Sequence, residues 1–582
     1  MARTRPPHLT KISGWPYWRY RILESVPALL TWGTFIGIFL LSILSPYIAA
    51  YFIVLYSLWW LVKAAHVSFH LINTYIKLGD NTAVDWQQNL KDLDDPRTAY
   101  ITNKARLREL QSVGYKNMFG FKDYWQHKRK LRNLKEYVAN LKLLAQRVLP
   151  YKWNELYHVV LIPSVNEGRK ILDTTLDSIL ATGYPMDRVM IVLAFEERAG
   201  EQYYIEDAKF LKDKYGDKFW KVETFTHPDG IVGELKGRGP NATYAARKTV
   251  EILEQENIAL ENVILSSFDA DTVPSNNYFH QLTYFYLTTP NPTKHSYQPL
   301  PLFFNNLWDA PMLSRISSMG STFWQMIEAS RSHRLLTFSS HAMSMKSLKA
   351  VNYWPLDVVQ DDSQIFWRMF IHYKGDYDVL PLPTTVKMDC VLGNTYWETL
   401  KAQYKQKRRW AWGVGDFAYV TQIFWRKGGA GIPFRKRLVR WARLVEGHYT
   451  WSTTAIILAL GGWLPFMLNK GGFELSVVSE NFFSTTRILL TVALVGLVIN
   501  VIVSMYQIPQ PPKDKGWWMK IIMVVQWVLA PVATVLLGSF PAIEAQTRYL
   551  TGHYLGFYVV PKVRKSKVDI NKFEASTIKH DA

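Results

Sequence analysis

The longest uncharged run in the chain, residues 25–62, constrains its fold more than any other feature. A run of this length accommodates two membrane helices of about 20 residues each. Ser45-Pro46 marks the break between them, because proline interrupts a helix interior. A signal peptide, the competing explanation, would have an apolar core of only about 7–15 residues followed by soluble sequence. A second apolar span follows at once here, so we expect a membrane hairpin.

Three more apolar segments lie toward the C-terminal end, at residues 447–469, 488–508 and 521–543. Each is long enough to cross a bilayer, and the proline-rich residues 507–513 separate the last two. Five spans are therefore predicted. The formal net charge of +20 fits a membrane protein that keeps its Lys and Arg residues on the cytoplasmic side.

The basic N-terminus, which includes Arg3 and Arg5, predicts on which side of the membrane the middle of the chain lies. Such residues favour a cytoplasmic start, and two crossings then return the chain to the cytoplasm. We place the protein in the plasma membrane, the inner membrane of a bacterium. Three further crossings would put the C-terminus outside, whereas Lys562 and Arg564 favour the cytoplasm. Either one late span is re-entrant or interfacial, or a further crossing exists.

The middle of the chain alternates between strand-like and helix-like segments. Strands are predicted at residues 159–163, 189–194, 219–225 and 263–267, and helices at 169–181, 201–214 and 242–255. This alternation predicts an α/β domain with a doubly wound, mostly parallel sheet covered by helices on both faces. Ligands of such sheets bind at the carboxyl ends of the strands.

Cysteine and histidine usage limits the kinds of metal site. Cys390 is the single cysteine, which excludes an intrachain disulfide and a thiolate metal cage. The fourteen histidines show no zinc-binding spacing. Any metal is therefore expected to be a hard ion held by carboxylates.

Two acidic pairs are candidates for that chemistry. Asp269 and Asp271 directly follow the strand at 263–267, where alternate carboxylates can share a divalent cation that binds phosphate oxygens. An Asp-x-Asp pair alone is common and usually marks a solvated turn. Asp361 and Asp362 precede a predicted helix, where helix capping competes with a role as general base.

A basic and aromatic cluster follows at residues 403–412, and it includes Gln406, Arg409 and Trp410. It could anchor an interfacial helix among lipid headgroups. It could equally hold a departing diphosphate through Arg409 while Trp410 stacks on a sugar ring.

The order of these motifs along the chain resembles glycosyltransferase family 2. Its elements are Pro163-Ser164-Val165-Asn166-Glu167, then Asp269-Ala270-Asp271, then Gln360-Asp361-Asp362, then Gln406-Lys407-Arg408-Arg409-Trp410. The sequence is most similar to the membrane-integrated branch that includes cellulose, chitin and hyaluronan synthases. The resemblance covers about residues 155–415, with flanking membrane helices at the expected places, and the Q-x-x-R-W element is its most specific part.

The resemblance implies a GT-A fold and an inverting hexosyltransferase. Asp271, with help from Asp269, would hold Mg²⁺ or Mn²⁺ against the donor diphosphate, and Asp362 would take the proton from the acceptor hydroxyl. The other residues that match family motifs are Ser164, Asn166, Glu167 and Lys236 on the donor side and Gln406, Arg409 and Trp410 near the acceptor and diphosphate.

Two departures from the family pattern bear on the substrate. The family has paired aspartates after the second strand, where this chain has Glu196-Glu197. One glutamate, for which we take Glu196 as the donor-binding candidate, would substitute. His341 lies in the stretch that meets the acceptor in the family. It could contact the acceptor or be a structural histidine.

These features divide the chain into six expected parts. They are a cytoplasmic N-terminus with a membrane hairpin (1–70), a helical or interfacial linker (71–150), the GT-A domain (151–415), an interfacial segment (416–446), membrane helices (447–545) and a tail (546–582).

The function expected from the sequence is transfer of sugar from a nucleotide-sugar donor to a growing polysaccharide. The same helices could also carry the polysaccharide across the membrane as it grows. A lipid acceptor, giving a single-transfer glycolipid synthase, is the second enzyme hypothesis. A non-catalytic scaffold or transporter is the alternative of another class. Membrane lipids are expected partners. Nucleic acid is not, because the sequence has no zinc-finger spacing, no basic-aromatic RNA-binding motif and no bZIP pattern.

Overall fold

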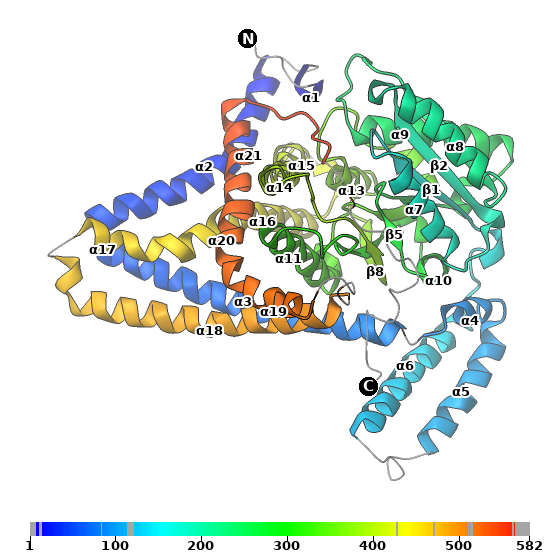
Figure 1. Cartoon of the computed structure of the whole chain (residues 1–582), viewed down its shortest axis with the longest axis horizontal. Coiled ribbons are helices and arrows are strands. Elements are labelled where there is room, and N and C mark those ends of the chain that lie inside the picture. The colour runs from blue at the N-terminus through cyan, green and yellow to red at the C-terminus, as the bar shows by residue number, and fades with distance from the viewer. Residues whose placement is uncertain are drawn as a thin grey trace.

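A mixed sheet and a set of long helices that extend from it make up the molecule (Figure 1). The computed structural model describes residues 7–10, 14–82, 84–112, 121–426, 429–469, 472–509, 511, 516–560 and 564. Arg3, Arg5 and Lys562, on which part of the topology prediction depends, lie outside these residues.

The sheet has eight strands in the order β3-β2-β1-β4-β7-β6-β8-β5. Their bounds are β1 Tyr157–Pro163, β2 Val189–Glu196, β3 Lys221–His227, β4 Val263–Ser267, β5 Val273–Pro274, β6 His295–Leu302, β7 His341–Ser344 and β8 Asp378–Lys387. The first four in spatial order are parallel. β7 is antiparallel to β4 and β6, and β8 is parallel to β6. The predicted α/β class with a mostly parallel sheet is therefore confirmed.

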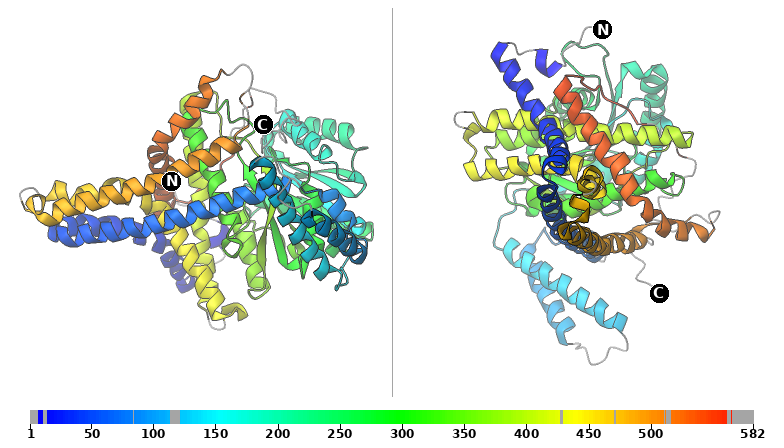
Figure 2. Two further views of the ribbon diagram at one scale, coloured as in Figure 1. Left: turned by 90° about the horizontal axis from the view of Figure 1, so that it is seen from below. Right: turned by 90° about the vertical axis from the view of Figure 1, so that its left-hand side faces the viewer.

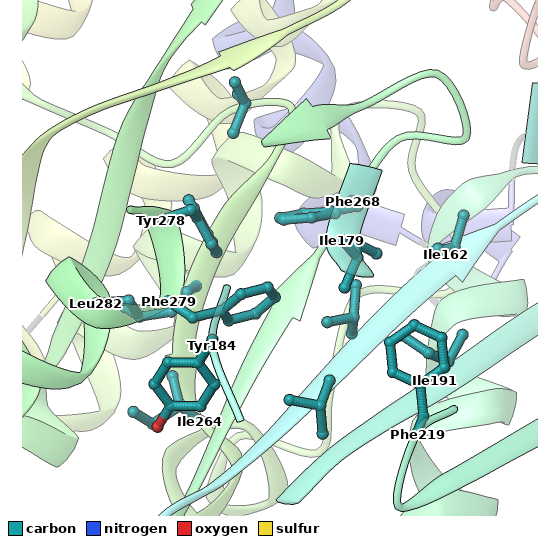
Figure 3. Close-up of a cluster of buried hydrophobic side chains, with 14 of the residues drawn as sticks. Ile162, Ile179, Tyr184, Ile191, Phe219, Ile264, Phe268, Tyr278, Phe279 and Leu282 are labelled. Atoms are coloured by element: carbon teal, nitrogen blue, oxygen red, sulfur yellow. The ribbon is translucent and has the colours of Figure 1, made fainter. Parts of the chain in front are cut away.

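Helices cover both faces of this sheet because successive side chains of each strand point to opposite sides. On β1, Val160 and Ile162 belong to one buried cluster and Val159 and Leu161 to another. The first cluster includes side chains of α7 (Arg169–Leu180) and α10 (Tyr278–Thr288), and Figure 3 shows part of it. The second includes α9 (Arg238–Gln255) and α13 (Asp361–His372).

Helix α9 begins at Arg238, earlier than the start predicted at residue 242. The first turn contains Gly239-Pro240, and proline is tolerated in the first turn of a helix. A Cβ atom at Gly239 would lie 2.5 Å from the carbonyl oxygen of Pro355 and 3.1 Å from Cβ of Asp361. Glycine therefore lets the start of α9 approach the start of α13, and this approach brings Arg238 to the acids of α13.

Within the described residues, five helical stretches are long and apolar enough to cross a membrane, which matches the predicted number. The first four comprise α2 (Gly14–Leu44), α3 (Pro46–Thr82), α16 and α17 (Phe434–Leu460 and Leu464–Leu468) and α18 (Val477–Gln507). α3 and α18 lie side by side and extend away from the sheet (Figures 1 and 2). The break between α2 and α3 falls at Ser45, where it was predicted.

The fifth stretch runs crosswise to α3 and α18 in both figures. It contains α19 (Trp518–Val525), α20 (Ala530–Thr534) and α21 (Phe540–Thr551), and α21 packs against α2 and against α14 (Tyr396–Ala411). The fifth stretch therefore differs in direction from α3 and α18, and the interfacial alternative for a late span stays a prediction.

Three further groups of helices surround the sheet and the long helices. α4 (Trp86–Lys91), α5 (Pro96–Ser112) and α6 (Phe121–Leu144) form an arm that projects beyond the sheet (Figure 1). α8 (Ala208–Tyr215) and α12 (Met345–Ala350) complete the cover of the sheet. α11 (Met312–Ala329), α14 and α15 (Asp416–Phe424) lie between the sheet and the long helices.

Candidate active site

One cavity of about 1480 Å³ joins the carboxyl edge of the sheet to the long helices. At the sheet, its wall includes Pro163 at the end of β1, Glu196 at the end of β2 and Asp269 after β4. Farther on, it is lined by residues of α3, α16 and α18. Its position at the ends of parallel strands is the place where α/β sheets bind ligands.

Arg238, at the start of α9, is the cation at the centre of three acids. Its Nη1 lies 3.2 Å from Oδ2 of Asp361 and donates to Oδ1 of Asp362, while Nε lies 3.5 Å from Oδ1 of Asp269. Nη2 donates to Oγ of Ser267 at 2.9 Å. Burial acts to lower the pKa of Arg238, but attraction by these three carboxylates outweighs it and raises the pKa. The guanidinium is therefore a fixed positive charge that holds the acids together.

Asp361 and Asp362 occupy the first turn of α13 but lie in different surroundings. The side chain of Asp362 is 30% exposed, and that of Asp361 is 5% exposed. Burial, followed by repulsion from Asp362, raises the pKa of Asp361 to about 7. Oδ2 of Asp362 accepts a hydrogen bond from the backbone N–H of Ser339 at 3.3 Å. Asp362 is thus the more accessible acid, and its position is fixed by two donors.

Asp269 and Asp271, the predicted metal ligands, both line the cavity. Oδ2 of Asp269 accepts from Oγ of Ser339 at 2.8 Å, so Ser339 contacts both Asp269 and Asp362. Oδ2 of Asp271 accepts from the backbone N–H of Asp389 at 2.9 Å. Asp389 follows β8 and also lines the cavity.

Asp389 was missed by the sequence analysis, although an acid directly after a strand is the signal that identified Asp269. Its carboxylate accepts from Nε of Arg564 at 2.8 Å and from Nη2 of Arg564 at 3.0 Å. Burial, followed by repulsion from Asp271, raises the pKa of Asp389. Two buried acids side by side require a nearby positive charge, and Arg564 supplies one.

The donor set fits a hard divalent cation in part. Among the described residues, no three His, Cys, Asp or Glu side chains are arranged to enclose a metal ion. Asp269 and Asp271 supply carboxylate oxygens of the kind that Mg²⁺ and Mn²⁺ prefer, and Mg²⁺ is usually held by only one or two carboxylates together with substrate phosphates. The residues present therefore fit a cation that completes its coordination on a donor diphosphate.

Helix α14 brings the Q-x-x-R-W residues to the same cavity. Gln406, Arg409 and Trp410 all line it, because residues three and four apart share one face of a helix. Burial lowers the pKa of Arg409, and attraction by Asp269 and Asp362 opposes that effect. The ring of Trp410 lies 5.9 Å from that of Phe303. Thr395 and Glu398 form a capping box that fixes the start of the helix.

Residues 557–560 of the C-terminal tail also line the cavity, which the sequence analysis did not foresee. The guanidinium of Arg409 lies 4.6 Å from the centre of the Phe557 ring. A Cβ atom at Gly237 would meet the same ring at 3.1 Å. The tail therefore passes over the start of α9 and reaches Asp389 through Arg564.

The predicted donor-side residues after β1 and β2 divide into two groups. Glu167 and Glu196 line the cavity. Ser164 is buried and donates to Oε2 of Glu167 at 2.9 Å, so it positions that carboxylate. Asn166 is exposed and lies outside the cavity wall. Of the two glutamates after β2, Glu196 faces the cavity, whereas Glu197 accepts from the backbone N–H of Asp229 at 2.9 Å.

The structure places two other predicted residues away from the cavity wall. Lys236 pairs with Asp229 at 2.7 Å on the surface, and Arg238 stands in the cavity instead. His341 is buried at the start of β7, where its Nδ1 lies 2.8 Å from the carbonyl oxygen of Ser339. Burial lowers the pKa of His341. These contacts fit a structural role for His341. They do not fit direct contact between His341 and an acceptor.

Asp416 gives a prediction for the pH dependence of stability. Burial raises its pKa to about 7 against hydrogen bonds from Ser363 and two glutamines, which lower it. Between about pH 4 and 7, Asp416 keeps its proton in the folded state but has lost it in the unfolded state. The free energy of unfolding therefore falls as pH rises through this range. The full loss in the free energy of unfolding is about 4 kcal/mol, because each pKa unit corresponds to about 1.4 kcal/mol. Melting temperatures of the wild type and Asp416→Asn at pH 5 and pH 8 should show a steeper decline for the wild type.

Exposed Asp376 provides the control for this prediction. Asp376→Asn should keep the wild-type decline in melting temperature. Parallel curves for the wild type and Asp416→Asn would contradict the assignment of this titration to Asp416.

Comparisons with known proteins found distant structural likenesses. No protein-family model and no curated sequence matches the chain. The structure is similar to mannosyltransferase PcManGT from Pyrobaculum calidifontis in complex with GDP-Man and Mn²⁺, at 12% identity over 76% of this chain and 99% of that one, with a TM-score of 0.34. It is also similar to S. aureus TarS 1–349 in complex with UDP-GlcNAc, at 12% identity over 70% and 95% of the chains, with a TM-score of 0.31.

A third likeness is to GalNAc-T7 with UDP, GalNAc and Mn²⁺, at 12% identity over 54% of this chain and 58% of that one, with a TM-score of 0.29. Likenesses with scores this low carry no argument about function. The strand order and the five apolar helical stretches identify the chain as an α/β protein with flanking helical segments of membrane-spanning length.

Proposed function

We propose that this chain is an inverting, metal-dependent membrane glycosyltransferase of family 2 type, with a GT-A domain, that extends a polysaccharide from a nucleotide-sugar donor. The observation that carries the proposal is the shared cavity. The neighbouring Asp269 and Asp271 line the same wall as Asp362, Arg409 and Trp410, which lie about 90 to 140 residues later in the sequence. A scaffold would have no need for buried acids and cations that face a cavity, because such groups are costly to desolvate.

The arrangement supports direct displacement at the anomeric carbon. The acceptor hydroxyl attacks from the face opposite the diphosphate, the bond from the anomeric carbon to the diphosphate oxygen breaks, and the hydroxyl proton passes to Asp362. A carboxylate base helps most as the hydroxyl loses its proton in the transition state. Ser339 and Arg238 hold this carboxylate in place.

The leaving diphosphate needs positive charge around it. A divalent cation held by Asp271 and Asp269 would neutralise charge on its oxygens. Arg409 is attracted by Asp269 and can donate to a phosphate oxygen. Trp410 offers an aromatic face for a sugar ring.

The length of the cavity favours a polymeric acceptor. Its lining follows α16 and the next turn from Arg440 to Trp463, which at 1.5 Å per residue is about 35 Å. This is close to the roughly 30 Å thickness of the hydrocarbon core. A polysaccharide could therefore leave along this path, with the sheet on the cytoplasmic side where nucleotide sugars are made.

A lipid acceptor is the second candidate, and the apolar wall of the same path favours it. Leu458, Phe482 and Leu490 line the cavity between α16 and α18. Incubation with a radiolabelled donor separates the two acceptors, because a synthase of the first kind makes long polymer and one of the second kind adds a single sugar to extracted lipid.

Narrowing the path tests the polymer proposal. Ala455→Trp would place an indole in the cavity wall of α16 and should shorten the polymer by at least about tenfold, because one bulky side chain closes a path of sugar-ring width. Val492→Trp on α18 is the matched control, since Val492 is exposed and not part of the wall. Gel filtration of the labelled product measures both. Products of unchanged length from Ala455→Trp would contradict passage along α16.

A further inference from the structure

A cluster of cations lines the cavity where it passes from the acids toward the long helices. We call Lys63, Arg331, Arg334, Arg440 and Arg443 the cationic collar. They come from α3, from the turn after α11 and from α16. The only carboxylates among the described residues of this part of the wall are Glu328 and Glu446.

The two carboxylates are already engaged by three members of the collar. Glu446 accepts from Lys63 and, at 2.8 Å, from Nη2 of Arg334. Glu328 accepts from Arg331 and lies 3.8 Å from Nε of Arg334. The carboxylates therefore neutralise fewer charges than the collar carries.

The remaining two cations are held in other ways. Arg440 is paired outside the cavity wall with Asp378 at 2.8 Å. Arg443 donates to the carbonyl oxygen of His333 at 2.7 Å, which leaves its charge without a carboxylate partner in the described part of the chain. Glu328, Glu446 and Asp378 together offset three of the five positive charges. Two positive charges therefore remain on this stretch of wall.

This surplus is partly buried, and burial makes it unfavourable. Arg331 is 7% exposed, and its Nε has no hydrogen-bond partner among the described residues. Burial, together with repulsion from Arg334, lowers the pKa of Arg331 despite attraction by Glu328. A buried cation without a full complement of acceptors is stabilised by an anionic ligand.

Membrane proteins in general carry Lys and Arg at the cytoplasmic ends of their helices, and that bias alone does not explain the collar. Residues serving that purpose face lipid headgroups or water. Here Arg331 and Arg440 are buried, and all five side chains belong to the wall of the cavity.

The collar is close to the reaction centre along the chain. Ser339, which contacts Asp269 and Asp362, follows Arg334 by five residues, so their Cα atoms are at most about 18 Å apart. Trp60 and Trp324 line the same stretch, and Nζ of Lys63 lies 5.5 Å from the Trp60 ring. Aromatic faces suit sugar rings. Arg487 of α18 lines the path farther on.

We propose that the cationic collar binds carboxylate or phosphate groups carried by the acceptor, which makes the acceptor an acidic glycan rather than a neutral one. This inference rests on the proposed function and names its substrate class. The collar holds the acidic groups one or a few sugars behind the hydroxyl that reacts, and the tryptophans contact the rings between them.

Binding without turnover tests this proposal separately from the enzyme proposal. The full-length Asp362→Asn chain in lipid nanodiscs is titrated with oligogalacturonate, a glycerol-phosphate oligomer, or neutral chitohexaose, and tryptophan fluorescence reports binding. At least one acidic oligomer should bind about tenfold more tightly than the neutral one, with a preference that weakens as salt rises. The carboxylate and phosphate probes show which acidic group is preferred.

The variant Arg443→Gln keeps a donor for the His333 carbonyl but removes one charge. It should weaken acidic-oligomer binding by about tenfold, the loss expected for one partly desolvated charge contact, and leave neutral binding unchanged. Arg435→Gln, on an exposed position of the same helix, is the matched control and should have no effect.

Equal affinity for acidic and neutral oligomers would overturn the collar proposal, and so would an equal effect of Arg443→Gln and Arg435→Gln. A third contrary result would be a fluorescence response to phosphatidic acid in the nanodiscs with no response to either acidic oligomer. The last result would assign the cluster to a lipid headgroup. If Asp362→Asn prefers acidic oligomers but the wild-type chain transfers sugar from no donor, the enzyme proposal is overturned and the collar proposal stands.

Discussion

Asp362→Asn is expected to lower the rate of sugar transfer by about 10²–10⁴-fold, the contribution of a positioned general base. Asparagine keeps the shape of the side chain and can still accept from Arg238 through its single oxygen. It loses the second oxygen, which accepts from the backbone N–H of Ser339, and it cannot take the acceptor proton. Donor binding should remain close to that of the wild type, because Asp269, Asp271 and Arg409 are unchanged. Nucleotide release and isothermal titration with the donor measure the two quantities.

Asp357→Asn provides the control for this experiment. Asp357 precedes α13 and is not part of the cavity wall, so its replacement should leave transfer within about twofold of the wild type, as expected for substitutions away from the site. Full transfer by Asp362→Asn would remove this residue as the base, and loss of donor binding as well would point to misfolding.

Removal of the second metal-site acid should produce the other large effect. Asp271→Asn is expected to reduce transfer by at least about 100-fold and to weaken Mn²⁺ binding, because it replaces a charged oxygen ligand with a neutral one. In the wild type, a chelator should abolish transfer and added Mn²⁺ or Mg²⁺ should restore it. Electron paramagnetic resonance of free Mn²⁺ measures binding independently of activity.

The variant Asp187→Asn is the matched control. Asp187 is exposed in the turn before β2 and is not part of the cavity wall. It should bind Mn²⁺ as the wild type does. Unchanged Mn²⁺ affinity and unchanged transfer in Asp271→Asn would contradict the metal assignment.

Local patterns in the sequence were sufficient for much of the fold. Strand β4 was predicted with its observed bounds, residues 263–267, because five apolar or small residues stand between helical and acidic segments. β1, β2 and β3 were placed within a few residues. Asp269 and Asp271 were identified because acids that follow a buried strand must lie at its carboxyl end, and that edge is where the cavity opens.

Contacts between distant segments could not be predicted in this way. Arg238 reaches Asp361 and Asp362 because glycine allows α9 to start against α13, and neither helix indicates this approach alone. Asp389 meets Asp271 only after β8 has joined the far side of the sheet. Apolar length also did not indicate that the stretch at Trp518–Thr551 runs crosswise to α3 and α18, since its direction depends on packing against α2 and α14.

The central claim is that the acids around this cavity act on one activated sugar. The most direct measurement is release of nucleoside diphosphate by the purified full-length chain in nanodiscs, with a panel of nucleotide sugars and with Mn²⁺ or Mg²⁺. The account predicts release from one donor or a closely related pair, abolished by a chelator and absent in Asp362→Asn. Release from no donor, or equal release by the wild type and Asp362→Asn, would contradict it.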